Sequence, residues 1–153
     1  MTIYVDADAC PARDEIVAIC VRHALLPVFV ANTSLPAIAR RKDARMEVVD
    51  GAFDAADDWI VNSALPGDLI LTADLLLAQR CVKKSVEAMN FSGGSLTDDI
   101  IHDLVARREI QKTLREMNLP AHQPVAYNQH NRSQLKSSLH TWIETRKRAA
   151  QAL

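Results

Sequence analysis

Aspartates that follow short apolar runs are the residues of this sequence best suited to chemistry. Asp6 ends the run that begins at Thr2, Asp8 comes two residues later, and Asp74 comes shortly after the run Asp68–Thr72. Packing rarely explains an acid at the end of an apolar strand, because carboxylates are seldom buried without a partner. Carboxylate oxygens are the ligands that Mg²⁺ and Mn²⁺ prefer, so we expect Asp6, Asp8 and Asp74 to bind one of these ions.

Three further aspartates lie at the start of a predicted helix over residues 54–65. Asp57 shares a face with Ile60 that should pack on the sheet, so it is the first candidate to point into the site, and Asp58 is the second. Acids at a helix start also act as caps, and Asp54 is predicted to be the N-cap with Asp57 as its capping-box partner. The candidate catalytic residues are therefore Asp6, Asp57, Asp58 and Asp74.

These aspartates must be positioned by strands and helices that alternate along the chain. Strands are predicted over residues 2–6, 28–31, 46–50, 68–72 and 85–89. Helices are predicted between them, over residues 11–26, 54–65 and 75–82. Such alternation is typical of an α/β fold, here three α/β/α layers with a mostly parallel sheet of about four to five strands. Ligand sites in such folds lie beyond the carboxyl ends of the strands, where Asp6, Asp8 and Asp74 fall.

The chain becomes helical and basic after residue 94. A helix, a turn-rich loop and a last helix are predicted over about residues 97–119, 120–131 and 132–150. A chain of this length fits one compact domain, so residues 1–153 are predicted to form a single domain whose basic helical part begins at about residue 95.

Charge is distributed unevenly between the two halves of the chain. Residues 1–75 hold six Lys/Arg against twelve Asp/Glu, whereas residues 76–153 hold twelve against seven. An acidic half that could hold a divalent metal beside a basic half that could hold phosphates suits an enzyme acting on a polyanion. Uneven solvated faces would produce the same asymmetry. Candidate phosphate contacts, or ordinary solvated side chains, are Arg13, Lys83, Lys84, Arg107 and Arg108.

Composition and the remaining reactive side chains exclude several classes of protein. No apolar stretch is long enough to cross a membrane, and the N-terminus has no basic leader, so we expect a cytoplasmic protein. Three widely spaced cysteines suggest neither disulfides nor a zinc site. The histidines show no metal-ligand spacing and are predicted to be surface or packing residues: His23, His102, His122, His130 and His140. Thr72 could orient Asp74 or bind a ligand, but an ordinary strand threonine is the simpler interpretation.

Several motifs in order resemble one known family over nearly the whole chain. They are Asp6-Ala-Asp-Ala-Cys-Pro11, Val48-Val-Asp-Gly51, Asp54-Ala-Ala-Asp-Asp-Trp-Ile-Val61, Gly67-Asp-Leu-Ile-Leu-Thr-Ala-Asp74 and Leu114-Arg115. This pattern is similar to the YaiI/YqxD family, a bacterial group of largely uncharacterised proteins that resembles PIN-like metal-dependent ribonucleases in fold and strand-end aspartates. The resemblance implies a PIN-like fold and a site at Asp6, Asp8, Asp57 or Asp58, and Asp74. Where the family has an Asn-Pro-Arg-Gly type of turn, this chain has Asn90-Phe-Ser-Gly-Gly94, so a basic residue is missing. The family also has a glycine-rich stretch near residues 117–124, which this chain replaces with Met117-Asn-Leu-Pro-Ala-His-Gln-Pro124.

The expected function is hydrolysis of phosphodiester bonds in single-stranded RNA by a Mg²⁺- or Mn²⁺-dependent ribonuclease. One alternative is a haloacid-dehalogenase-like phosphatase, because Asp6-Ala-Asp8 after an apolar strand also resembles the nucleophile and acid/base pair of that group. A second alternative is a non-catalytic module that binds RNA or a protein partner and keeps the acidic site as a structural cation site.

Overall fold

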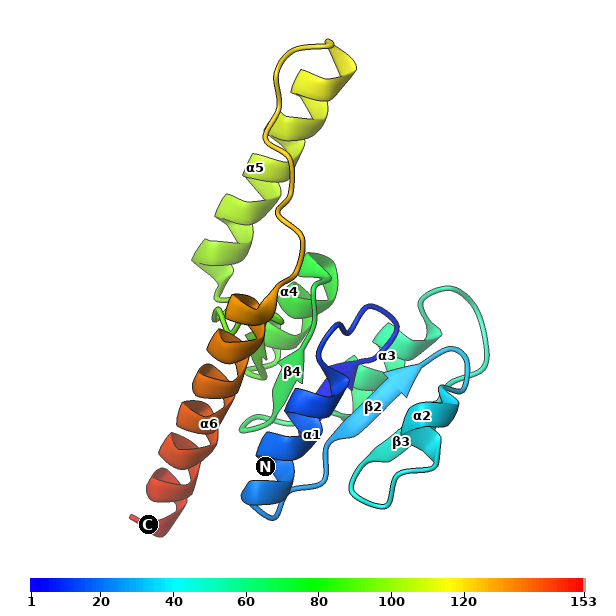
Figure 1. The fold of residues 1–153 in the computed structure, drawn as a ribbon, viewed down its shortest axis with the longest axis vertical. Coiled ribbons are helices and arrows are strands. Elements are labelled where there is room, and N and C mark those ends of the chain that lie inside the picture. The colour runs from blue at the N-terminus through cyan, green and yellow to red at the C-terminus, as the bar shows by residue number, and fades with distance from the viewer. Residues whose placement is uncertain (153) are drawn as a thin grey trace.

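A computed structural model describes residues 1–152 and contains one five-stranded parallel sheet (Figure 1). The strands are β1 (Ile3–Asp6), β2 (Val28–Ala31), β3 (Arg45–Val48), β4 (Leu69–Leu71) and β5 (Glu87–Met89). The helices are α1 (Arg13–Arg22), α2 (Pro36–Ala39), α3 (Ala55–Ser63), α4 (Leu75–Lys83), α5 (Asp98–Glu116) and α6 (Gln129–Gln151). All four pairs of neighbouring strands are parallel, which confirms the predicted α/β class.

The sheet is the middle of three layers, as predicted. Successive strand residues point to opposite faces, so Val5 and Leu71 pack in one core while Tyr4 and Ile70 pack in the other. The first core is closed by α1, α2 and α6, and the second by α3, α4 and the start of α5. Strands buried on both faces explain the nearly continuous apolar runs of β1, β2 and β4.

The strand order is β3-β2-β1-β4-β5, so the direction in which strands are added reverses at β1. From β1 the chain builds outward through β2 and β3, and it then returns to the other side of β1 to place β4 and β5. Loops that leave such neighbouring strands in opposite directions open a crevice at their carboxyl ends, where open parallel sheets bind ligands. Asp6 and Thr72 lie at this switch point between β1 and β4.

Of the two C-terminal helices, α6 packs against the body of the protein and α5 projects from it as an arm (Figure 1). Helix α6 buries Leu135, Leu139 and Ile143 in the same core as β1, so it is an integral part of the fold. Helix α5 buries Ile101 near its start and then projects away from the sheet, and the chain returns along it through residues 117–128.

Truncation of α6 at its buried stripe is expected to destabilise the whole domain. Leu139 has no exposed surface, and Leu139→Ala removes packing against the sheet core and leaves a cavity. We expect a loss of about 2–5 kcal/mol in the free energy of unfolding. Urea unfolding measures this loss, and Ile110→Ala on the exposed part of α5 is the matched control. An equal, small effect of both substitutions would show that α6 does not belong to the core.

Several predicted boundaries differ from the structure. The first helix spans Arg13–Arg22 rather than residues 11–26, because Ala12 is its N-cap and Ala24 adopts a positive φ that ends the helical path. Helix α2 was not predicted, since its single turn is too short to show periodicity. All three cysteines are buried and none forms a disulfide within residues 1–152. In that same range no helix is long and apolar enough to cross a membrane.

Candidate metal centre

A buried threonine connects the two strand-end aspartates. Thr72 follows β4 directly and has no exposed surface. Its hydroxyl donates a hydrogen bond of 2.9 Å to Oδ2 of Asp6 and accepts one of 2.9 Å from the backbone N–H of Asp74. Thr72 therefore holds the Asp6 carboxylate and the start of α4 in a fixed relation across the switch point.

Asp74 is held by the helix that it begins. One oxygen, Oδ1, accepts hydrogen bonds from the backbone N–H groups of Leu76 at 2.9 Å and Leu77 at 3.2 Å, so Asp74 is the N-cap of α4. A carboxylate accepts at both oxygens, and capping through Oδ1 leaves Oδ2 to bind a cation. The capping role and a role in metal binding are thus compatible in this residue.

Asp57 lies near the two strand-end acids, whereas Asp58 is paired elsewhere. Burial, together with the negative charges of Asp6, Asp74 and Asp54, raises the pKa of Asp57 to about 6 against the opposing effect of Arg80. Asp58 is more than half exposed and forms a 2.8 Å ion pair with the Arg80 guanidinium. The structure thus brings Asp57 together with Asp6 and Asp74 and places Asp58 outside this group.

Asp6 and Asp8 differ in their surroundings. Burial raises the pKa of Asp6, the Thr72 hydrogen bond opposes that increase, and the charges of Asp74 and Asp8 add to it. Asp8 is exposed in the turn after β1, where its charge reaches Asp6. Neighbouring carboxylates therefore contribute to the raised pKa values of both Asp6 and Asp57, as expected where a cation would relieve the repulsion.

The chemistry of these carboxylates, rather than a tight cluster of their oxygens, fits a hydrated cation. Oxygens of Asp6, Asp57 and Asp74 do not all lie within 4.8 Å of one another. Mg²⁺ loses water reluctantly and is commonly held by one or two carboxylates together with several waters and substrate phosphates. The donor set is entirely oxygen, which is the chemistry of Mg²⁺ and Mn²⁺ sites, so the residues present fit such an ion.

The predicted capping box at the start of α3 is wrong. Asp54 occupies the N-cap position, but its side chain makes no capping hydrogen bond. Asn32, just beyond β2, instead accepts from the backbone N–H of Ala56 at 3.2 Å and donates to the carbonyl of Phe53 at 3.4 Å. A residue from the neighbouring strand thus satisfies the helix start, which frees the acids of α3 from capping.

The five candidate phosphate contacts lie in different places. Arg108, on α5, lines a cavity of about 420 Å³ together with Thr72, Phe91 and Tyr127. Arg13, the first residue of α1, donates a hydrogen bond to the Ala7 carbonyl at 3.4 Å. Its buried Nε has no protein partner within residues 1–152.

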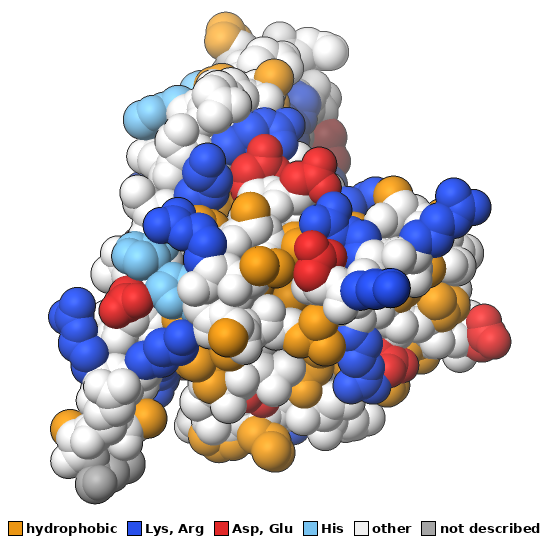
Figure 2. All heavy atoms as spheres, turned by 60° about the horizontal axis from the view of Figure 1, so that its bottom comes forward, with side chains coloured by type: hydrophobic (Ala, Val, Ile, Leu, Met, Phe, Trp, Pro, Cys, Tyr) orange, Lys and Arg blue, Asp and Glu red, His pale blue; other side chains and the backbone are white. Residues whose placement is uncertain are grey.

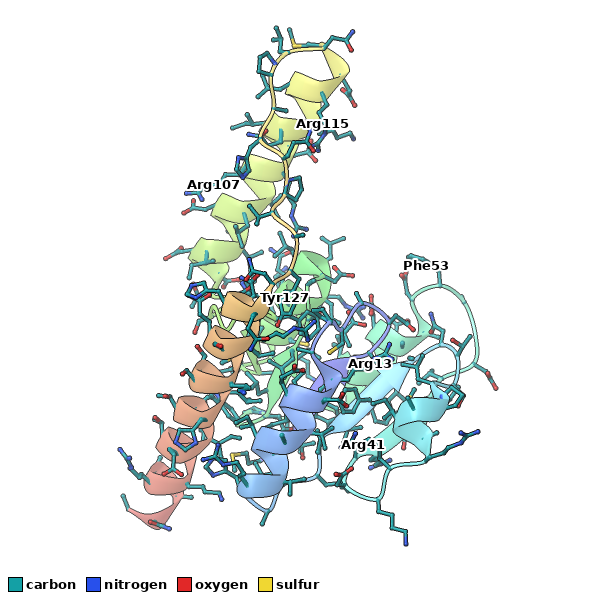
Figure 3. The ribbon with its side chains drawn as sticks, in the orientation of Figure 1. Arg13, Arg41, Phe53, Arg107, Arg115 and Tyr127 are labelled. Atoms are coloured by element: carbon teal, nitrogen blue, oxygen red, sulfur yellow. The ribbon has the colours of Figure 1, made fainter. Side chains whose placement is uncertain are left out.

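The other three candidates lie away from the aspartates. Arg107 is on the projecting arm, and its side chain points away from the body of the protein (Figure 3). Lys83 and Lys84 lie at the far end of α4 from Asp74, and Lys84 donates to the carbonyls of Val61 and Ala64.

Sequence reasoning passed over the residues that organise this site through distant contacts. Arg80 was not considered, and its spacing from Asp58 along the chain carries no local signal. Asn32 was overlooked, although an amide directly after a buried strand is a signal that could have been used. An ordinary strand threonine is the simpler interpretation of Thr72 from sequence, with the orientation of Asp74 as the alternative; the structure shows a bond to the backbone of Asp74 and a bond to Asp6, 66 positions away.

Crowding of acids at this site is expected to reduce the stability of the fold. The pKa of Asp57 is higher in the folded chain than its ordinary value, so its ionisation opposes folding above about pH 6 and ceases to do so as the pH falls toward 4. Because Asp57 is partly exposed, the cost after solvent screening is on the order of 1 kcal/mol. We therefore expect Asp57→Asn to raise the Tm by about 2–4 °C at pH 7.5 in EDTA.

The difference in Tm between Asp57→Asn and wild type should shrink toward pH 4.5, where the wild-type carboxyl is protonated. Thermal unfolding at both pH values measures it, and Asp99→Asn on exposed α5 is the control. A lower Tm for Asp57→Asn at pH 7.5 would contradict the crowding of charge at this position.

The chain matches relatives of similar length along nearly its whole sequence. Residues 4–145 match the family described as "Uncharacterized BCR, YaiI/YqxD family". A UPF0178 protein of Rhodospirillum rubrum is 34% identical over 148 residues, which cover 97% of this chain and 99% of the relative. A UPF0178 protein of Rhodopseudomonas palustris (strain BisB18) is 38% identical over 141 residues, covering 92% and 90% of the two chains. No solved structure is significantly similar to this chain.

Proposed function

The chain belongs to the YaiI/YqxD family, and from this premise we propose that it is a Mg²⁺- or Mn²⁺-dependent nuclease that cleaves single-stranded RNA. The observation that carries the proposal is the convergence of Asp6, Asp57 and Asp74 at the switch point of a parallel sheet. Ligand sites occupy this position in α/β folds, and crowded carboxylates with raised pKa values are typical of functional sites.

The roles of the individual residues follow from their contacts. A divalent cation at this site supplies Lewis-acid polarisation of a phosphodiester and activation of water. Asp6 is kept in place by Thr72, and Asp74 by the first turn of α4, so both carboxylates are fixed at the carboxyl edge of the sheet. Asp57 has a pKa of about 6, which makes it the carboxylate best suited to exchange a proton near neutral pH.

The surroundings of the site support a single-stranded polyanionic substrate. The cavity beside Thr72 is lined by Arg108, a candidate phosphate contact, by the half-buried Tyr127 and by the buried Phe91. Phe53 is 92% exposed in the loop between β3 and α3, close in sequence to Asp57 and at the carboxyl edge of the sheet (Figure 3). An exposed aromatic side chain such as this one offers a platform on which an unpaired base stacks.

Cleavage of a labelled single-stranded RNA tests this function. Wild-type protein with Mn²⁺ or Mg²⁺ should cut the RNA, and EDTA should stop the reaction. Asp74→Asn should also be inactive, while its helix start is preserved because asparagine caps as well as aspartate does. Cleavage that persists in EDTA or in Asp74→Asn, or the absence of any cleavage by wild type, would refute the proposal.

The two alternative functions predict other outcomes of the same assays. A phosphatase that uses Asp6 as nucleophile would form a phosphoenzyme that fluoride analogues trap, and it would release phosphate from monoesters. A non-catalytic RNA-binding module would bind RNA without cleaving it, and its affinity would not fall when Asp6 and Asp74 are replaced by asparagine. Neither alternative has a contact in this structure that favours it over the nuclease.

Arg108 is expected to contribute to RNA affinity through a phosphate contact. Arg108→Ala should weaken binding about threefold to tenfold at low salt and reduce the salt dependence of log K by about 0.7, the value for one phosphate contact on a single strand. Fluorescence anisotropy in EDTA, with a fluorescently labelled RNA, measures both effects without cleavage. Lys83→Ala is the matched control, because Lys83 lies at the opposite end of α4 from the site. Equal losses in the two variants would remove Arg108 from the RNA-binding surface.

A further inference from the structure

A second cluster of ligand side chains joins α1 to α6, far from the aspartates. His23 is the C-cap of α1, and His140 and Glu144 come from α6. Since α1 ends just before β2 begins, the cluster lies near the amino ends of the strands, whereas Asp6 ends β1 at the carboxyl edge. Figure 2 shows histidine side chains beside an acidic side chain on this face, bordered by lysine and arginine side chains.

The three side chains are close enough to share one ion. Nε2 of His23 lies 2.8 Å from Nδ1 of His140, and Nδ1 of His23 lies 3.4 Å from Oε1 of Glu144. One ligand atom from each residue can be chosen so that all three lie within 4.8 Å of one another, which within residues 1–152 no other group of His, Cys, Asp and Glu achieves. The sequence shows no metal-ligand spacing here because 117 residues separate His23 from His140, and the fold brings the two side chains together.

The backbone presents these ligands on rigid supports. His140 and Glu144 are four residues apart on α6 and so share one helix face, the spacing by which helices offer two ligands to one metal. Their neighbours Leu139 and Ile143 have no exposed surface and fix α6 against the core. His23 is 9% exposed, and its carbonyl accepts a 2.7 Å hydrogen bond from Lys147 of α6.

We propose that His23, His140 and Glu144 form a zinc-binding site that ties α6 to the end of α1. Two imidazoles and one carboxylate are a common zinc ligand set, and bonds of about 2.0–2.2 Å place tetrahedral ligand atoms about 3.3 Å apart. His140 and Glu144 flank the two nitrogens of the same His23 ring, so they must converge on one of them. The partly exposed Glu144 side chain has room to make that movement and leaves the fourth position to water.

The ligand set distinguishes this site from the aspartate cluster. Imidazole nitrogen suits Zn²⁺, Co²⁺ and Ni²⁺, whereas sites made only of carboxylates suit Mg²⁺ and Mn²⁺. An excess of Mg²⁺ should therefore occupy the aspartates without competing at the histidines. A bound zinc ion would also stabilise the packing of α6, because an ion that binds the folded chain alone raises its Tm.

Titration of Zn²⁺ in the presence of millimolar Mg²⁺ tests the proposal, with calorimetry for affinity and the visible spectrum of bound Co²⁺ for tetrahedral geometry. Wild type should bind one equivalent, and His140→Ala and Glu144→Gln should each lower the affinity more than about tenfold. His102→Ala on exposed α5 is the control and should bind as wild type does. The Asp6→Asn/Asp74→Asn double variant should also retain zinc binding, which separates this site from the proposed nuclease centre.

Two results would overturn the zinc site. The first is the absence of saturable Zn²⁺ binding by wild type, which would make the cluster a hydrogen-bonded contact between two helices. The second is an unchanged affinity in His140→Ala, which would place the zinc elsewhere. Both α6 ligands are partly exposed, so their variants should fold, and circular dichroism in EDTA verifies this before each titration.

Discussion

Asp6→Asn is expected to lower the rate of metal-dependent RNA cleavage by a factor of about 10²–10³, the effect typical of removing one preorganised electrostatic contact that stabilises a transition state. Asparagine keeps an oxygen that can accept the Thr72 hydrogen bond, so the substitution removes the charge while the local geometry persists. It also removes the acid that lies closest to the centre of the sheet, at the end of β1. Single-turnover cleavage of a labelled RNA at saturating Mn²⁺ measures the loss.

The control for this effect is Asp50→Asn, an exposed acid that follows β3 outside the cluster. It should retain full activity. Activity of Asp6→Asn within a few-fold of wild type would contradict the role of Asp6, whatever the outcome at other positions. A loss of folding, checked by the Tm in EDTA, would be visible before the kinetic comparison is made.

Asp57→Asn and Asp58→Asn form a matched pair that we expect to differ about 100-fold in cleavage rate. The two residues are neighbours on α3, yet Asp57 lies near Asp6 and Asp74 while Asp58 pairs with Arg80 at the surface. Asp57→Asn should therefore be nearly inactive and Asp58→Asn nearly normal. The difference in cleavage rate at one pH is the first measurement, and the rates of both variants over pH 5–9 are the second.

The pH profile follows from the pKa of Asp57. Because this pKa is about 6 in the metal-free protein, wild-type activity should fall as the pH drops through that region and the carboxylate becomes protonated. A bound cation would shift the midpoint to lower pH, since it favours the ionised form. Equal activity of the two variants, or a larger loss in Asp58→Asn, would show that the orientation of α3 in the working protein differs from this one.

The placement of the candidate site residues Asp6 and Asp74 at one edge of the sheet could be predicted from local sequence, because parallel strands share one carboxyl edge. Asp6 and Asp74 each follow an apolar run, and β1 and β4 are indeed neighbours, so the two runs bring their ends together. The choice of Asp57 over Asp58 also came from local pattern, since the stripe containing Ile60 sets the buried face of α3. Periodicity of 2 and of 3.6 residues carries this information.

The links between distant segments could not be predicted. Thr72 forms a hydrogen bond with Asp6 across 66 residues, and His23 lies against His140 across 117. Neither contact is indicated by the local sequence around these residues. Local spacing favours Asp54 as the cap of α3, but Asn32, which follows β2, accepts the hydrogen bond from the helix start instead. Contacts of this kind depend on strand order, which composition and periodicity do not determine.

The boundaries of the helices were less accurate than their existence. Apolar spacing continued the first helix to Leu26, whereas the positive φ of Ala24 turns the chain toward β2. In α6 the reverse occurred, because the capping box of Asn128 and Asn131 begins the helix before the predicted residue 132. Cap geometry rather than hydrophobic pattern decided both ends.

Calorimetric titration of Mn²⁺ tests the central claim most directly, because the proposed cleavage requires a metal bound by Asp6 and Asp74, with Asp57 beside it. Wild-type protein should bind Mn²⁺ saturably below millimolar concentration, and the Asp6→Asn/Asp74→Asn double variant should lose that binding while His140→Ala retains it. Absence of saturable binding by wild type at millimolar Mn²⁺, or unchanged binding by the double variant, would contradict the account and leave these acids as structural residues of the sheet edge.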